Sequence, residues 1–168
     1  LLTPLSKAWC TDLGNELTSI NLQVHGGMGF IEETGAAQHY RDIRIGAIYE
    51  GTNGIQALDL IGRKLGLAGG RLPWYWFEEF EGDLSALDDA GHGDLAAELG
   101  VALAGLKKAT SWLQEDHDDP DDRAAGATPY LRMFATTVGA FLLARAALAA
   151  TSVDDRLAEA KMASARFY

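Results

Sequence analysis

The segment Arg41–Gln56, RDIRIGAIYEGTNGIQ, places a single carboxylate, Glu50, directly before Gly51. Apolar residues lead into this carboxylate, and apolar residues at three- and four-residue steps predict a helix after it. An apolar environment raises the pKa of a carboxyl group, and a glycine lets another molecule come close to the backbone. The segment therefore indicates a candidate base that removes a proton from carbon.

Glu50 also fits a plainer role as a solvated loop carboxylate. The next helix begins nearby, with Thr52 or Asn53 as its N-cap, and a negative charge beside a helix N-terminus is favourable. The local residues leave both interpretations open.

Helical spacing continues on both sides of this segment. The first helix has Thr3 as N-cap and Pro4 at its first position, and no convincing two-residue alternation appears anywhere. The sequence therefore predicts an all-α fold of two helical bundles. We expect seven helices, at about residues 3–24, 33–45, 53–66, 74–87, 95–114, 129–151 and 153–168.

The best internal boundary is LAGGRLP at residues 67–73, where two adjacent glycines and a proline interrupt the helical pattern. We therefore expect one domain at residues 1–66, a linker at 67–73 and a second helical domain at 74–168. The chain opens without Met and ends inside a helical pattern, so we expect it to be a piece of a longer protein.

The composition limits the partners. The formal net charge of −10 over 168 residues disfavours nucleic acid, because phosphate contact needs clustered Lys and Arg. No run of 18 apolar residues occurs, so we expect no transmembrane segment. The lone Cys10 excludes a disulfide within the chain and fits a reducing, cytoplasmic compartment, and its neighbours predict a buried thiol.

A second candidate site is QVHGGMG, at residues 23–29. Its three glycines permit positive φ angles and close approach of a ligand to the backbone. The same residues also fit a plain helix C-cap, and the segment matches no phosphate-loop pattern. Both interpretations stay open.

The remaining clusters favour structural roles. Arg41, Asp42 and Arg44 predict an ion pair that orders the loop before Glu50, with a direct substrate contact as the alternative. The aromatic run at residues 74–80 predicts packing between helices, because acidic residues surround it. We expect no metal site: the four histidines lack ligand spacing, and the acidic segment 116–122 lacks the glycine and final Glu of an EF-hand.

Three linked motifs, QVHGGMGF at 23–30, RDIRI at 41–45 and IYEGTNGIQ at 48–56, resemble the C-terminal helical domain of acyl-CoA dehydrogenases in residues, order and spacing. The resemblance covers roughly residues 3–65. Residues from 73 onward resemble, more weakly, the extra C-terminal helical domain of the larger bacterial members, some of which act on sulfur-containing acyl-CoA esters.

The resemblance implies FAD-dependent oxidation of the Cα–Cβ bond of an acyl-CoA, with Glu50 as the α-proton base and its N–H on the thioester carbonyl. Gly51 then borders the acyl chain, and Thr52, Asn53 and Gly54 contact FAD. Gln23, Val24, His25, Gly26 and Gly27 match a loop that reaches the FAD of a neighbouring subunit, which implies a homo-oligomer.

The family usually passes its electrons to an electron-transfer flavoprotein, so we expect that partner for a cytoplasmic bacterial enzyme. The flavin- and CoA-holding domains of the family are absent here, so we expect this fragment alone to be inactive. Two other functions stay open: an acyl-CoA oxidase of the same fold, and a non-enzymatic helical assembly module. A DNA-associated flavoprotein of the same superfamily is disfavoured by the acidic charge.

Overall fold

The computed structural model describes residues 1–115 and 120–168, and within these ranges every regular element is a helix. The all-α prediction is confirmed. The described elements are α1 (Leu2–Val24), α2 (Gly27–Phe30), η1 (Glu32–Thr34), α3 (Ala36–Arg44), η2 (Ile45–Ala47), α4 (Asn53–Gly62), η3 (Lys64–Gly66), α5 (Leu72–Asp89), α6 (Gly93–Gln114), α7 (Pro120–Ala125), α8 (Ala127–Ala150) and α9 (Asp155–Phe167), where η marks a 3₁₀ turn.

The described ranges hold nine α-helices, and the two beyond the expected seven are the short helices α2 and α7. The prediction that Thr3 caps the first helix is wrong, because α1 begins at Leu2 and its N-cap is Leu1. Pro4 is tolerated there since the first backbone N–H groups of a helix have no partner within it. The helix expected to end near Gly66 ends at Gly62, and the 3₁₀ turn η3 follows.

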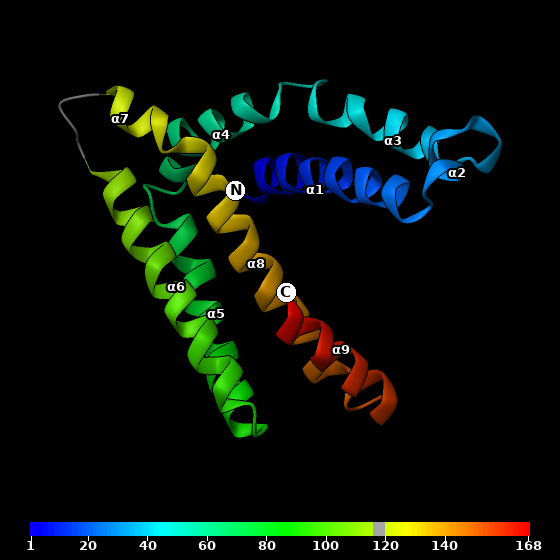
Figure 1. Ribbon diagram of the computed structural model, residues 1–168. Helices are drawn as coiled ribbons and strands as arrows, with labels where there is room; N and C mark the ends of the chain where they lie inside the picture. The colour runs from blue at the N-terminus through cyan, green and yellow to red at the C-terminus, as the bar shows by residue number, and fades with distance from the viewer. Residues whose placement is uncertain (116–119) are drawn as a thin grey trace. The chain divides into compact units, whose positions relative to one another are not determined.

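Contacts divide the described chain into two units, with residues 1–64 and 120–132 in the first and 65–115 and 133–168 in the second. In the first unit, α1 packs against both α3 and α4, and α7 contacts α4. Figure 1 shows α3 and α4 following one another along the same side of α1. Leu5, Ala8, Ala57 and Leu60 are buried between these helices.

In the second unit, α5 and α6 form an antiparallel pair (Figure 1) with extensive contact between them. Phe77 and Phe80 of α5 are fully buried, and their rings meet Phe134 and Phe141 of α8 at centroid distances of 5.7 and 4.3 Å. The prediction that the aromatic run packs between helices is therefore confirmed. The proposed division into domains 1–66 and 74–168 stays a prediction about independent folding.

One expectation needs correction, and one stays a prediction. Cys10 is exposed in the first unit, because it lies on the face of α1 opposite the buried Leu5 and Ala8. By length and composition α8 could cross a membrane, because it has 24 residues and contains an 18-residue window with a mean hydropathy of 1.6. A core helix passes the same test, and the burial of Phe134 and Phe141 in α8 fits that explanation.

Candidate active site

Glu50 lies in the short loop between η2 and α4, where the backbone takes an uncommon conformation. Its φ angle is 54°, in the left-handed region, and Gly51 follows with a φ of 82°. A non-glycine residue in this region costs about 1–3 kcal/mol and persists only where the surroundings hold it there. Strained backbone of this kind is typical of functional sites, so the groups that hold the loop are informative.

Two side chains outside the loop hold its carbonyl groups. Lys7 Nζ, from α1, donates to the carbonyl oxygen of Gly51 at 2.7 Å. Gln56 Nε2, from α4, donates to the carbonyl oxygen of Glu50 at 3.0 Å. The two peptide planes that follow the Cα atoms of Glu50 and Gly51 are thus held by polar side chains.

Asn53, at the first position of α4, joins the same network. Its Oδ1 accepts a hydrogen bond from Lys7 Nζ at 2.8 Å. Its Nδ2 donates to Asp12 Oδ1 at 2.6 Å and lies 3.0 Å from Thr11 Oγ1. The Asn53 side chain therefore ties α4 to α1, and residues Thr52 and Gly54 beside it are exposed.

The Glu50 N–H has no hydrogen-bond acceptor among the described residues. Its side chain is exposed, so the described residues of this chain alone do not close the apolar environment that the sequence suggested around it. The side chains next to it are apolar but open, with Ile48, Tyr49 and Ile55 exposed by 47, 56 and 55%. The loop therefore exposes one carboxylate and several large apolar side chains close to it in sequence.

The second predicted site lies at the other end of α1. Gln23 and Val24 are its last residues, His25 is its C-cap, and Gly26 has a φ of 61° where the chain turns. This turn therefore caps the helix, and the cofactor role of Gln23 to Gly27, which all remain exposed, stays a prediction. A glycine is required at position 29, because a Cβ there would lie 2.3 Å from the Leu22 carbonyl oxygen.

A hollow of about 540 Å³ lies beside this turn. Its walls combine apolar surface with an ion pair in which Arg41 donates to both carboxylate oxygens of Glu32, at 2.8 and 2.7 Å. The predicted pair of Asp42, which was to order the loop before Glu50, does not occur among the described residues; Arg41 instead joins α3 to Glu32 of η1. The lining residues are Leu22, Phe30, Ile31, Glu32, Glu33, Ala37, Tyr40 and Arg41.

The structure separates the two predicted sites. Lys7, which binds the Glu50 loop, and Val24, beside the glycine turn, are 17 positions apart on one helix. At about 1.5 Å per residue this is roughly 25 Å. Figure 1 shows α2 at the far end of α1 from the N-terminus. The two sites therefore do not form a single pocket within this unit.

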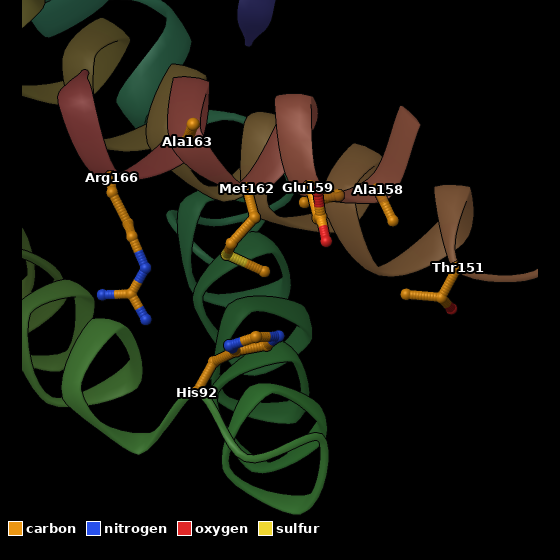
Figure 2. Close-up of a pocket in the computed structure, with 8 residues that line it drawn as sticks. His92, Thr151, Ala158, Glu159, Met162, Ala163 and Arg166 are labelled. Atoms are coloured by element: carbon orange, nitrogen blue, oxygen red, sulfur yellow. The ribbon is translucent and has the colours of Figure 1, made fainter. Parts of the chain in front are cut away.

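The second unit has a hollow of about 390 Å³, drawn in Figure 2, which contains none of the site residues expected from sequence. Met162 of α9 and His92, the residue before α6, point toward one another across it. No three His, Cys, Asp or Glu side chains gather as a metal site in residues 1–115 and 120–168. Residues 116–119 of the acidic segment lie outside the described residues.

Four residues that hold the Glu50 loop and Asn53 were not predicted from the sequence: Lys7, Gln56, Thr11 and Asp12. Lys7 carried no usable signal in the sequence, because Ser6 also stands between the core residues Leu5 and Ala8 and is exposed. Lys7 is half-buried, and its ammonium therefore needs oxygen partners, which only the packing of α1 against the loop supplies.

Family models match both parts of the chain. Residues 2–66 match the model described as acyl-CoA dehydrogenase, C-terminal domain, and residues 76–168 match the one described as acetyl-CoA dehydrogenase C-terminal like. The chain is 40% identical to 3-methylmercaptopropionyl-CoA dehydrogenase of Ruegeria pomeroyi over 176 aligned residues, 99% of this chain and 30% of that protein.

Two further relatives match different shares of this chain. A butyryl-CoA dehydrogenase of Syntrophomonas wolfei is 30% identical over 98% of this chain and 29% of its own length. The caffeyl-CoA reductase-Etf complex subunit CarC of Acetobacterium woodii is 36% identical over 36% of this chain and 16% of its own length. The chain thus spans about three tenths of the curated relatives that match it along nearly its whole length.

Proposed function

Because the chain belongs to the acyl-CoA dehydrogenase family, we propose that in the complete protein Glu50 is the base that removes the α-proton of an acyl-CoA thioester. The supporting observation is the Glu50–Gly51 backbone, whose positive φ angles are held by Lys7 and Gln56. A loop held this firmly fixes the Cα–Cβ direction of one exposed glutamate.

The chemistry needs a base and a polarised carbonyl. The proton α to a thioester is weakly acidic, so its removal requires a positioned carboxylate and a donor that stabilises the developing oxyanion. The Glu50 N–H is a suitable donor, because no acceptor among the described residues occupies it. Ile48, Tyr49 and Ile55 supply apolar surface that excludes water once the rest of the protein covers them.

The described residues fit a flavin. Thr52 and Gly54 are exposed at the start of α4, where backbone N–H groups point outward and attract an electronegative group. The Asn53 side chain fits poorly, because its amide is already bonded to α1, so residue 53 would contact FAD through its backbone. FAD, when bound, supplies the acceptor for the hydride that leaves Cβ.

The separation of the two sites supports an oligomer. The exposed turn at Gln23 to Gly27 and the hollow beside it lie roughly 25 Å along α1 from the Glu50 loop, estimated from the helix rise. One subunit can therefore provide its base to one active site and its glycine turn to the FAD of another. The first unit also exposes many large apolar side chains for such contacts: Leu17, Ile20, Val24, Met28, Phe30, Ile31, Tyr40, Ile45, Ile48, Tyr49, Ile55 and Leu58.

We propose an electron-transfer flavoprotein as the electron acceptor and a cytoplasmic location. The first is supported by the relative CarC, whose name places it in a complex with Etf. A sulfur-containing acyl-CoA is the first substrate to test, because the relative from Ruegeria pomeroyi is named for one.

The test is flavin reduction in the full-length, FAD-loaded protein, followed as loss of the flavin's visible absorbance after acyl-CoA is added. Replacing Glu50→Gln should slow reduction at least about 100-fold with FAD still bound, because a general base contributes 10²–10⁴-fold. The exposed Glu16 on α1 provides a matched control, and Glu16→Gln should reduce as the wild type does.

Near-normal reduction by the Glu50→Gln protein would exclude Glu50 as the base. Hydrogen peroxide formed in step with substrate use, with no need for an electron-transfer flavoprotein, would favour the oxidase. A colourless, stable oligomer that takes up no FAD would favour the assembly module.

A further inference from the structure

Lys7 is half-buried on α1, and its ammonium contacts the Glu50 loop at two points. Nζ lies 2.7 Å from the Gly51 carbonyl oxygen and 2.8 Å from Asn53 Oδ1. These two acceptors flank Thr52, so the lysine bridges the last turn of the loop and the first residue of α4. The contact crosses more than 40 positions of sequence and is tertiary.

Both acceptors of Lys7 are neutral oxygens. No ion pair of Lys7 with a carboxylate occurs in the part of the chain that the structure describes. A half-buried ammonium is costly without partners, so its place here depends on these two oxygens. A hydrogen bond from a charged donor is about twice as strong as one between two neutral groups. The Lys7 ammonium can therefore hold the strained peptide of the loop.

The contact acts on the carboxylate through the backbone. The ψ angle of Gly51 orients its carbonyl, and the Lys7 bond holds that carbonyl beside the positive φ angle of 82°. Gln56 fixes the preceding carbonyl, that of Glu50 itself. With both carbonyl groups held, the Cα–Cβ direction of Glu50 has little freedom left.

We propose that Lys7 is a positioning residue, which aims the Glu50 carboxylate by holding the Gly51 carbonyl. This inference rests on the proposed function of Glu50. The proposed role differs from a role in folding. Loss of the ammonium loosens the loop and slows proton removal, while the helices stay folded and FAD and substrate still bind.

The experiment compares three variants of the full-length, FAD-loaded protein: Lys7→Met, Lys7→Arg and Lys64→Met. Lys64 is also half-buried in the first unit and makes no hydrogen bond to the loop, which makes it the matched control. Three quantities are measured: the rate of flavin reduction at saturating acyl-CoA, the half-saturating concentration, and amide hydrogen exchange in peptides covering residues 48–56.

In Lys7→Met the reduction rate should fall by about tenfold or more, with the half-saturating concentration within about threefold of wild type, as for a residue that acts on the transition state alone. Exchange should accelerate in residues 48–56 and not in α1. Lys7→Arg keeps the charge and the donors and should recover most of the rate. Lys64→Met should match the wild type in all three quantities.

Unchanged reduction or unchanged loop exchange in Lys7→Met would overturn the inference. Loss of FAD or unfolding of that variant would also overturn it, because the lysine would then support the whole bundle. Failure of the proposed function has a separate signature, which is wild-type reduction by Glu50→Gln whatever the Lys7 variants do.

Discussion

The side-chain amide of Asn53 donates a hydrogen bond to the carboxylate of Asp12, with 2.6 Å between Nδ2 and Oδ1. The two residues stand at the start of α4 and in the first half of α1, 41 positions apart in sequence. The same amide reaches Thr11, and its oxygen accepts from Lys7. The Asn53 side chain, which lies in the segment IYEGTNG, thus joins α4 to α1.

Replacing Asn53→Ala should lower the free energy of unfolding by about 1–3 kcal/mol, because polar partners on α1 lose their hydrogen bonds. Thr52→Ala is the matched control and should change it by no more than about 0.5 kcal/mol, since the Thr52 side chain makes no capping hydrogen bond. Urea denaturation without FAD measures both. Equal effects of the two substitutions would show that the Asn53 network adds no stability.

Two glycines of the turn after α1 should respond oppositely to a methyl group. Gly29→Ala should destabilise the turn, because its Cβ would lie 2.3 Å from a backbone oxygen. Gly27→Ala should be neutral or stabilising, because its Cβ meets nothing within 4 Å and alanine favours helix. Thermal unfolding of the two variants tests this, and a destabilised Gly27→Ala would contradict the geometry.

The stacked rings of Phe80 and Phe141 predict where the second unit is most sensitive. Phe141→Ala should cost about 3–5 kcal/mol, because it leaves a cavity in a fully buried layer. Leu142→Ala, one position along α8 and 49% exposed, should cost about 1 kcal/mol or less. Denaturant unfolding followed by far-UV circular dichroism compares them, and similar costs would contradict this packing.

Arg166 of α9 donates hydrogen bonds to both carboxylate oxygens of Asp94 in the first turn of α6. These bonds lower the pKa of Asp94 from 3.8 to about 2. Because the folded pKa lies below the unfolded one, the pair's contribution is complete above pH 4 and is lost as the pH falls toward 2.

Hydrogen exchange in α9 should therefore accelerate between pH 4 and pH 2, beyond the intrinsic effect of pH on exchange. In Asp94→Asn, α9 should exchange faster already at neutral pH, and the further acceleration between pH 4 and pH 2 should disappear. An NMR titration that places the Asp94 carboxyl near its ordinary pKa would contradict the expected pairing.

Most of the helices could be predicted from the sequence, because helix formation depends on residues that are close together in the chain. The spacing of apolar residues along α1, α5, α6 and α8 reflects a helical period of 3.6, and each helix must bury its apolar stripe. The burial of Phe77 and Phe80 followed from their apolar size and from the acidic residues around them. The predicted helix ends were less accurate, as at Thr3, because capping depends on side-chain geometry that composition does not encode.

The site was predictable only in part. Glu50 and the glycine turn stood out by residue type, and the family resemblance gave them roles. Lys7 did not stand out, because a lysine on a helix carries no sign of the carbonyl it will meet 44 positions later. Cys10 was assigned to the core from its neighbours, although its place on the helix turned it outward.

The sequence by itself determined the helical class, the aromatic core of the second unit and the family to which the chain belongs. Only the tertiary structure decided which side chains hold the Glu50 loop and how far the glycine turn lies from it. The reason is physical: helix formation and burial depend on residues a few positions apart, whereas the bonds of Lys7 and Asn53 exist only after α1 and α4 have packed together.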